Sequence, residues 1–455
     1  MELHKRMILL VMGDIVSALL SLPVALLIRN RTIPTIGDVR GLGYGVIVVY
    51  ITIVVFSSFL VEFYRNHNEM FASDMAIKIA FSLGLSAYVL ALFTYTLPAG
   101  SQGSGILAVS LVIFGMLQFI CHFLYRHYVN FKGFARRILI LGVGPLADHV
   151  GAIIPSTDEN YVLSGYVNCS NEASQVPVGT VLENKGGLYE TVRQQKADKI
   201  VVSLSERRGV FPFHEVMACK LSGVEVIDAP SFYEKVTGKL FLEGINPSWI
   251  IFSDGFKVSS WLRGGKRAMD LICALIGIIL TLPFLPLIAL AIKLDSAGPV
   301  FYRQERVGEK EKHFFLYKFR TMRADAENGT GAVWAQKNDT RITRLGAFFR
   351  KCRIDELPQF INVLSGDMSM VGPRPERPEF VEKLKERIPY YSERHFVKPG
   401  VTGWAQVRYP YGASVEDAVE KLRYDLYYIK NISLAFDLMI ILETIQVVLF
   451  RRGAR

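Results

Sequence analysis

Four long runs of apolar residues dominate the first third of the chain, near residues 7–28, 42–63, 75–97 and 105–125. Each has about the 20 residues that a helix needs to cross the hydrocarbon core of a bilayer. We therefore predict a four-helix transmembrane bundle over residues 1–130. The first run carries Asp14 and Pro23 and is followed by three more runs, so we do not interpret it as a cleaved signal peptide.

Charged residues around the bundle bear on its orientation. Basic residues flank both ends, namely Lys5 and Arg6 before it and Arg126, Lys132, Arg136 and Arg137 after it. Because basic residues gather on the cytoplasmic side of membranes, both ends are predicted to be cytoplasmic. Three arginines in the first predicted loop favour the opposite orientation: Arg29, Arg31 and Arg40. The acidic residues of this region are predicted to lie at helix ends or face the bundle interior rather than form an ion pathway: Asp14, Glu62 and Asp74.

After residue 130 the pattern changes to short apolar runs that alternate with helical stretches. In "RILILGVGPLADHV" an apolar strand leads into a glycine turn and a helix, and strand-like runs follow at 161–168, 199–204 and 223–228. This alternation predicts a parallel sheet, so residues 131–258 should form a Rossmann-like cytoplasmic domain. Gly142 and Gly144 would let a phosphate approach the backbone. The second strand ends at Asn168, where dinucleotide-binding folds have an acidic residue, which favours a degenerate structural or regulatory sheet over nucleotide binding.

A further membrane element is predicted at about residues 268–293, an apolar run that is broken by Pro283 and Pro286. Its length alone would allow it to span the bilayer. Basic residues flank both of its ends, however, and proline bends or breaks a helix. We therefore predict a re-entrant helical hairpin that enters and leaves by the cytoplasmic face, with a kinked spanning helix as the alternative.

Composition supports a membrane protein with anionic partners. The 455 residues carry a formal net charge of +10 and have a mean hydropathy of +0.27, which is too apolar for an ordinary soluble protein. The excess of Lys and Arg suits phosphates or acidic membrane lipid, whereas no nucleic-acid-binding motif is present. The five cysteines are widely spaced and include no CxxC motif, so reduced thiols are expected rather than disulfides or a zinc site.

The last part of the chain contains the strings "RQERVG", "LYKFRTMRADAE", "RIDELPQ", "GDMS", "GPRP" and "PGVTGWAQ" in that order. Together they resemble the bacterial sugar transferase family, the monotopic phosphoglycosyl transferases, from about residue 266 to the C-terminus. The four spans and the degenerate, CoA-binding-like sheet upstream look like the long form of that family, the undecaprenyl-phosphate sugar-1-phosphate transferases of exopolysaccharide and lipopolysaccharide O-antigen biosynthesis. The expected fold is thus a membrane protein of α plus α/β class, with a mainly helical catalytic domain over residues 259–455.

The resemblance implies an activity and a location. A sugar 1-phosphate would pass from a UDP-sugar to undecaprenyl phosphate with release of UMP, through a covalent aspartyl intermediate and with Mg²⁺, at the cytoplasmic face of a bacterial inner membrane. It assigns Asp355 as the nucleophile and Glu356 as the magnesium ligand. A possible homo-oligomer is also expected. Two other hypotheses are a membrane-bound nucleotide-sugar dehydratase, whose Tyr-x-x-x-Lys pair we do not find, and a non-catalytic scaffold that senses nucleotide-sugars.

The residue types suit this chemistry on their own. Moving a phosphoryl group between two anions requires charge neutralisation, which Arg and Mg²⁺ supply. One carboxylate can be a nucleophile and another can hold Mg²⁺. Nearby cations are predicted to keep Asp355 ionised. The alternative for Asp355 and Glu356 is a solvated acidic pair at a helix end, balanced by Arg350, Lys351 and Arg353.

Further candidate residues surround this pair in the sequence. Arg374 lies between the prolines of "GPRP" and is predicted to bind a diphosphate, with an ion pair to Asp367 as the alternative. Lys318 and Arg320 would share one basic face of a strand and bind substrate phosphates or lipid headgroups. Gln359, Asn362 and Asp367 are expected to orient the pair, and Arg353 is expected to bind substrate. Gln406 and Arg408 could reach the uridine or the sugar, with a purely structural role as the alternative.

Overall fold

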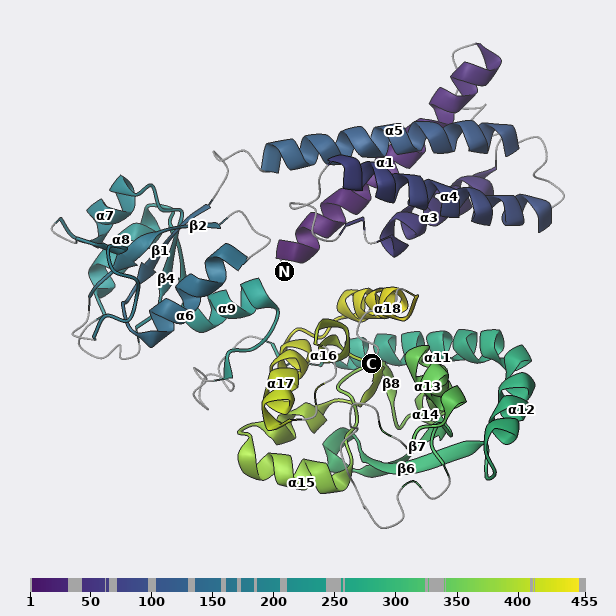
Figure 1. The fold of residues 1–455 in the computed structure, drawn as a ribbon. Helices are drawn as coiled ribbons and strands as arrows, with labels where there is room; N and C mark the ends of the chain where they lie inside the picture. Colours follow the sequence, from purple (N-terminus) through teal and green to yellow (C-terminus); the bar gives the residue numbers. More distant parts are fainter. Residues whose placement is uncertain are drawn as a thin grey trace. The chain divides into compact units, whose positions relative to one another are not determined.

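A computed structural model describes residues 2–31, 43–61, 63–64, 72–96, 104–129, 136–156, 161–169, 173–183, 186–204, 211–242, 255–256, 258–323, 326, 339, 341–409, 412 and 414–449. Contacts divide the chain into two compact units, Met1–Thr237 and Gly238–Arg455, which are described separately (Figure 1). Segment 238–242 belongs to the second unit, because the Gly238 carbonyl accepts a hydrogen bond from Trp404 Nε1 at 2.7 Å and Leu240 N donates to the Arg423 carbonyl at 3.0 Å.

The first unit begins with four apolar helices: α1 (Glu2–Asn30), α3 (Tyr44–Leu60), α4 (Ala72–Thr96) and α5 (Ser104–Val129). In the described part of the chain, the helices with the length and composition of a membrane span are α1, α4, α5 and the helical segment Ser260–Asp295. Helix α3 is equally apolar but has 17 residues. The predicted helical bundle is therefore confirmed, with one helix shorter than expected.

Asp14 faces the interior of this bundle, as predicted. Its buried carboxylate accepts a hydrogen bond from Gln118 Nε2 at 2.6 Å and contacts His122 Nε2 at 2.9 Å. Both partners lie on α5, so the polar contact joins α1 to α5. Glu62 and Arg40 lie outside the described residues, as does the side chain of Asp74.

The rest of the first unit is a parallel sheet with the strand order β3-β2-β1-β4-β5. The strands are β1 (Arg136–Leu141), β2 (Tyr161–Val167), β3 (Val181–Leu182), β4 (Lys199–Val202) and β5 (Glu225–Asp228). Between them run α6 (Pro145–Ile153), η3 (Ile154–Ser156), α7 (Leu188–Gln194) and α8 (Phe213–Leu221), and α9 (Ala229–Thr237) follows β5. All strand pairs are parallel, which confirms the predicted α/β class.

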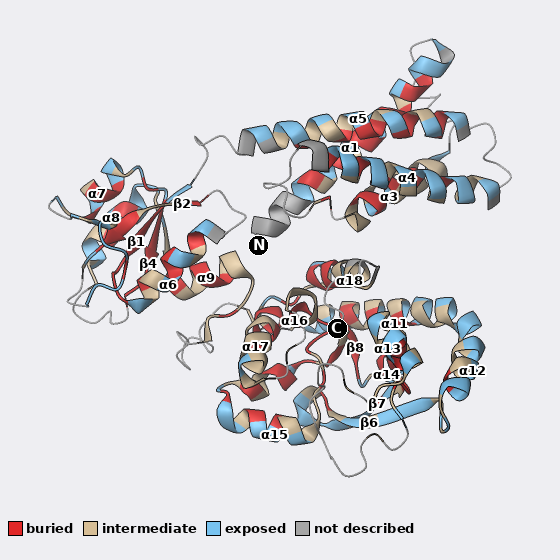
Figure 2. Cartoon of the chain, in the orientation of Figure 1, coloured by how far each residue is buried: buried red, intermediate tan, exposed pale blue. Residues whose placement is uncertain are grey.

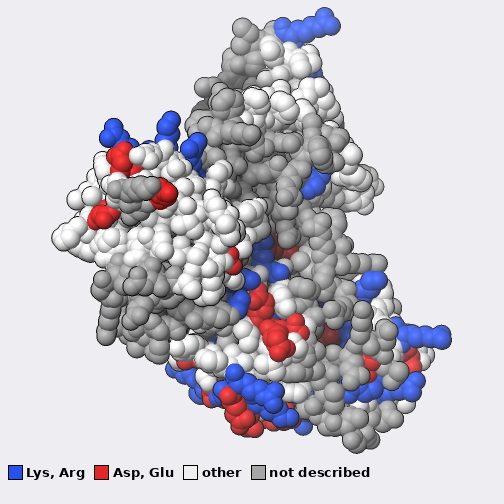
Figure 3. All heavy atoms as spheres, turned by 60° about the vertical axis from the view of Figure 1, so that its left-hand side comes forward, with Lys and Arg blue, Asp and Glu red and all other residues white. Residues whose placement is uncertain are grey.

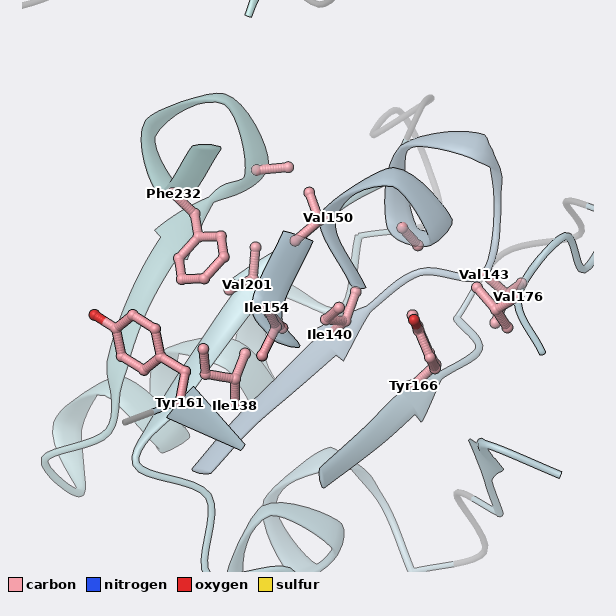
Figure 4. Packing of buried hydrophobic residues seen from close by; sticks show 12 residues of the cluster. Ile138, Ile140, Val143, Val150, Ile154, Tyr161, Tyr166, Val176, Val201 and Phe232 are labelled. Atoms are coloured by element: carbon pink, nitrogen blue, oxygen red, sulfur yellow. The ribbon is translucent and has the colours of Figure 1, made fainter. Parts of the chain in front are cut away.

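Alternate residues of β1 feed two separate hydrophobic cores. Ile138 and Ile140 pack on one face with residues of α6 and α9, including Val150 and Phe232 (Figure 4). Leu139 and Leu141 pack on the other face with residues of α7 and α8. This arrangement follows from the two-residue period of a strand that is covered by helices on both faces.

The turn after β1 contains Gly142 and Gly144, the two glycines that we considered from the sequence for phosphate binding. A Cβ on Gly142 would lie 2.6 Å from the backbone oxygen of Ser203, so close approach of the segment after β4 explains this glycine. The chain that follows β2 crosses the turn, where Gln175 N donates to the Val143 carbonyl at 2.8 Å. Packing of the sheet thus accounts for Gly142 without a bound phosphate.

The second unit is mainly helical around short strands. Its first half contains α11 (Ser260–Thr281), η5 (Leu282–Phe284), α12 (Leu285–Asp295), β6 (Phe301–Val307), η6 (Glu309–Glu311), β7 (His313–Phe319), α13 (Arg344–Lys351), η7 (Ile354–Glu356) and α14 (Gln359–Ser365). Its second half contains β8 (Ser369–Val371), α15 (Pro378–Arg387), η8 (Tyr391–Phe396), β9 (Gly400–Thr402), α16 (Trp404–Arg408), α17 (Val415–Lys430) and α18 (Leu434–Leu449). Strands β6 and β7 are antiparallel, whereas β8 and β9 are parallel.

The apolar segment Ser260–Asp295 is two helices rather than one. Helix α11 ends at the turn η5, which contains Pro283, and α12 begins with Pro286 as its second residue and leaves in a different direction (Figure 1). The predicted break at the prolines is therefore confirmed. Much of both helices is exposed apolar surface, seen in pale blue in Figure 2, including Leu275, Ile279 and Leu287.

Helix α18 packs on the rest of the second unit and is held there by polar residues within its apolar sequence. Asp437 is fully buried and accepts hydrogen bonds from Lys266 Nζ at 2.7 Å and from the Tyr428 hydroxyl at 2.7 Å. Glu443 accepts a hydrogen bond from Arg408 at 3.0 Å. With 16 residues, α18 is also shorter than a typical membrane span.

Candidate active site

Asp355 and Glu356 lie together in the short helix η7, between α13 and α14. Arg353 precedes them in the left-handed backbone conformation, with φ at 57°, which turns the chain sharply out of α13. Asp355 is 6% exposed and Glu356 is 8% exposed. The alternative of a solvated acidic pair is therefore wrong.

Three basic side chains surround the Glu356 carboxylate. Arg374 donates a hydrogen bond to Oε1 at 2.6 Å, Arg353 Nη1 lies 3.4 Å from it, and Lys318 Nζ lies 3.8 Å from it. Arg374 lies in the segment after β8, Arg353 lies in the turn before η7, and Lys318 lies in β7. The fold thus gathers residues up to 56 positions apart in the sequence around one carboxylate.

The two carboxyl groups have opposite pKa shifts. Burial acts to raise the pKa of Glu356, but Arg374, Lys318 and Arg353 outweigh it and hold that pKa well below the usual value. Burial, followed by the negative charge of Glu356, raises the pKa of Asp355, although Lys318 lowers it in part. We expected nearby cations to keep Asp355 ionised, but burial and the neighbouring Glu356 carboxylate outweigh them and raise its pKa.

Asp355 also has an oxygen without a hydrogen-bond partner. Its Oδ1 atom is buried and meets no donor among the described residues. Most buried side-chain oxygens in folded proteins are hydrogen-bonded, so such an atom requires an explanation. An oxygen that reacts with a substrate or binds a metal ion would have this environment.

Lys318 is held beside the pair by the register of β7. The side chain of Asn362, on α14, accepts a hydrogen bond from Tyr317 N at 3.0 Å and donates one to the Phe315 carbonyl at 2.8 Å. Asn362 therefore fixes the backbone of β7, whereas from the sequence we expected it to orient the carboxylate pair. Burial lowers the pKa of Lys318 to about 8, with Glu356 acting in the opposite direction.

Arg320 is not part of this group of cations. It lies after the end of β7, and its guanidinium donates to the Ser296 carbonyl at 2.6 Å and to the Ala297 carbonyl at 3.0 Å, beyond the C-terminus of α12. The predicted shared basic face of Lys318 and Arg320 is therefore wrong. The guanidinium of Arg320 instead satisfies carbonyls at the end of an apolar helix.

Arg374 joins two of the predicted residues. Besides Glu356 it donates to Gln406 Oε1 at 2.8 Å. Its alternative partner Asp367 is exposed and accepts a hydrogen bond from Ser365 at 2.7 Å. Gln406 therefore belongs to the site through Arg374, and the predicted alternative ion pair between Arg374 and Asp367 is wrong.

The other candidates have contacts away from the pair. The guanidinium of Arg408 lies 4.3 Å from the centre of the Trp404 ring and pairs with Glu443. Trp404 in turn packs against Tyr427 and Phe436. Gln359 is buried at the start of α14, directly after the Pro358 N-cap.

Sequence reasoning missed Arg394, a buried residue of η8 that donates to the Arg374 carbonyl at 2.9 Å. No local pattern marks it, because its acidic partner Asp425 lies 31 residues further along the chain.

On the face seen in Figure 3, Lys and Arg lie beside Asp and Glu on the second unit. Ion pairs of the second unit include Arg377–Glu379 and Lys385–Glu311.

The residues present fit a magnesium ion that is shared with a substrate. Among the described residues, no group of three His, Cys, Asp or Glu side chains is placed to hold a metal ion by itself. Mg²⁺ commonly takes only one or two carboxylates and completes its shell with water and substrate phosphates. Glu356, which is ionised, and the unpartnered Asp355 Oδ1 provide such a donor set.

Comparisons with known proteins identify relatives of this chain. The family model for bacterial sugar transferases matches residues 261–451. The chain is 42% identical over 237 residues to a UDP-N-acetylgalactosamine-undecaprenyl-phosphate N-acetylgalactosaminephosphotransferase from Aeromonas hydrophila, covering 52% of this chain and 55% of that protein. It is 44% identical over 191 residues to a UDP-glucose:undecaprenyl-phosphate glucose-1-phosphate transferase from Xanthomonas campestris, covering 42% and 40% of the two chains.

A third relative is covered almost completely. The exopolysaccharide production protein PSS from Rhizobium leguminosarum is 43% identical over 185 residues, which is 40% of this chain and 92% of that protein. The alignments span about half the length of the Aeromonas and Xanthomonas relatives. The chain therefore belongs to the bacterial sugar transferase family.

Proposed function

We propose that the protein transfers a sugar 1-phosphate from a UDP-sugar to undecaprenyl phosphate and releases UMP, and so initiates a polysaccharide repeat unit. The observation that carries this proposal is the buried pair Asp355–Glu356 with three cations around it. The names of the Aeromonas and Xanthomonas relatives describe this chemistry with two different sugars, so the family does not specify the sugar for this chain.

In the proposed reaction a carboxylate oxygen of Asp355 attacks the β-phosphorus of the UDP-sugar. The bond between that phosphorus and the bridging oxygen breaks, UMP leaves with the electron pair, and the sugar phosphate remains on Asp355 as an acyl phosphate. An oxygen of undecaprenyl phosphate then attacks the same phosphorus. This step releases the Asp355 carboxylate and forms the lipid diphosphate.

The basic residues would neutralise the charge of the substrates. Lys318, Arg353 and Arg374 are already oriented around Glu356, so they need little reorganisation when a diphosphate arrives. Mg²⁺, held by Glu356 together with substrate oxygens, would supply further charge neutralisation at the diphosphate. Cations fixed in a buried site stabilise developing charge more strongly than the same cations in water.

We also propose that α11 and α12 form a re-entrant hairpin at the cytoplasmic face of a bacterial inner membrane. In the first third of α11, Lys266 donates to the Val371 carbonyl at 2.9 Å and to Asp437 at 2.7 Å. At the end of α12, Ile292 packs with Phe319 and Phe349. Both ends thus contact the same unit, whereas a spanning helix would separate its ends by the roughly 30 Å of the hydrocarbon core.

The test is transfer of label from a panel of radiolabelled UDP-sugars into an organic-soluble lipid fraction, with and without Mg²⁺. We expect one or a few sugars to label the lipid with equimolar release of UMP, and only when Mg²⁺ is present. A dehydratase would modify the sugar without labelling lipid, and a scaffold would do neither. Either of these results would overturn the proposed function.

A further inference from the structure

The segment that carries Arg374 is fixed almost entirely through its carbonyl groups. Residues 373–376 belong to no helix or strand, and Pro373 and Pro375 have no backbone N–H to donate. Three of the four carbonyls accept from backbone or side-chain donors of other segments: Gly400 N to Pro373 at 2.9 Å, Arg306 Nη1 to Pro375 at 2.9 Å and Val307 N to Glu376 at 3.0 Å.

The fourth carbonyl, that of Arg374 itself, accepts from Arg394 Nη2 at 2.9 Å. The same nitrogen donates to Asp425 Oδ2 at 2.9 Å, and Nη1 donates to the Tyr391 hydroxyl at 2.7 Å. Arg394 is 6% exposed and Asp425 is 2% exposed. One buried guanidinium therefore connects η8, α17 and the backbone of the arginine that binds Glu356.

We propose that Arg394, held in place by Asp425, is a positioning residue for Arg374. It fixes the backbone from which the Arg374 guanidinium reaches Glu356 and Gln406, and it has no hydrogen bond to either carboxyl group of the pair. This inference rests on the proposed transferase function, in which Arg374 must be correctly placed for the diphosphate.

The energetics of buried ion pairs favour a role for Arg394 and Asp425 beyond stability. Replacing a buried ion pair by well-packed apolar residues is often neutral or stabilising, so stability alone gives weak grounds for burying Arg394 and Asp425. A lysine would neutralise Asp425, but a single ammonium group on a flexible chain does not reproduce the planar fork that serves three acceptors. Misplacement of a site residue by about 1 Å can cost on the order of 10²-fold in rate.

The test uses Arg394→Met combined with Asp425→Leu, which removes the pair without leaving a buried charge. In full-length protein in detergent with UDP-sugar and undecaprenyl phosphate, we expect a melting temperature close to that of the wild type. We expect kcat/KM to fall by at least about tenfold and up to about 10²-fold, mainly through kcat, because Arg374 keeps its charge but loses its position.

A double-mutant cycle with Arg374→Ala distinguishes positioning from an independent effect. If Arg394 acts through Arg374, the double replacement should add little to the loss that Arg374→Ala causes. The matched control is Glu420→Gln, which removes two ion pairs of α17, those of Glu420 with Lys239 and with Arg423. This control should leave kcat/KM within twofold of the wild type. Arg394→Lys, which keeps a cation beside Asp425, provides the same cycle if the double replacement does not fold.

The outcomes separate this inference from the function on which it rests. Wild-type protein that transfers no sugar phosphate would overturn the proposed function. Active wild type together with a folded Arg394 variant within twofold of its kcat/KM would overturn the positioning role. Losses that multiply with those of Arg374→Ala would also overturn it.

Discussion

Arg374→Lys tests whether directed hydrogen bonds, and not only positive charge, are needed at the carboxylate pair. Arg374 donates to Glu356 at 2.6 Å and to Gln406 at 2.8 Å. A lysine keeps the charge but does not reproduce the fork that holds both acceptors, so at least one hydrogen bond is lost. Hydrogen bonds to charged groups contribute about 1.5–3 kcal/mol, which corresponds to a loss of about 10- to 150-fold in kcat/KM.

The assay is UMP release at limiting and saturating UDP-sugar, with the melting temperature measured to verify folding. The matched control is Arg377→Lys in the same segment, where Arg377 pairs with exposed Glu379 at 3.5 Å and should tolerate the change. A folded Arg374→Lys protein within twofold of the wild type would refute the reasoning. An equal loss in Arg377→Lys would do so as well.

Three further predictions concern the metal, the pH dependence and the membrane segment. Glu356→Gln should lower the rate and weaken its dependence on Mg²⁺, and an unchanged Mg²⁺ titration would argue against a ligand role. Burial, and next Arg394, lowers the pKa of His395 to about 4, so this residue is neutral when folded but charged in the unfolded chain below its usual pKa of 6.5. Stability from this group is therefore complete above about pH 6.5 and is lost as the pH falls toward about 4, by up to about 3 kcal/mol. The melting temperature of His395→Gln should fall less over this range than that of the wild type, and parallel curves would contradict the assignment. In a protein without native cysteines, Arg263→Cys and Asp295→Cys, both at exposed positions, should resist a membrane-impermeant thiol reagent in intact cells and react after lysis. Labelling of the second position alone in intact cells would show that the segment crosses the bilayer.

Local patterns were sufficient for the architecture of the first unit. Residues 138–141 form a short apolar run before a glycine turn, which is typical of a strand covered on both faces, and alternate residues of this run pack into the two cores. Pro283 marked the break between α11 and α12 because its ring removes a helix hydrogen bond whatever the surroundings. Features set by one or two neighbouring residues could thus be predicted from the sequence.

The sequence predicted which residue types form the site, but not how the fold arranges them. Asp355, Glu356 and Arg374 were identified from motifs, but the sequence placed Arg320 with Lys318 on one face. Strand β7 ends at Phe319, one residue before Arg320, and the Arg320 guanidinium donates to the Ser296 and Ala297 carbonyls just after α12. The raised pKa of Asp355 could not be predicted either, because its largest cause is burial, which depends on the tertiary fold.

Lys266 shows the same limit at the membrane segment. Its charge suggested a residue that flanks the membrane on the cytoplasmic side, yet its ammonium group is buried and donates to Asp437 at 2.7 Å and to the Val371 carbonyl at 2.9 Å. The partners are more than 100 residues away in the sequence. Long-range ion pairs of this kind leave no periodic signal in the chain.

The central claim is that Asp355 carries the sugar phosphate during transfer. The most direct measurement incubates the protein with a UDP-sugar labelled at the β-phosphorus, without undecaprenyl phosphate, followed by a rapid quench and peptide mapping. We predict label on the peptide that contains Asp355, no label in Asp355→Asn, and discharge of the label when undecaprenyl phosphate is added. Transfer to lipid by a folded Asp355→Asn protein, or active wild type that never acquires label on this peptide, would contradict the account.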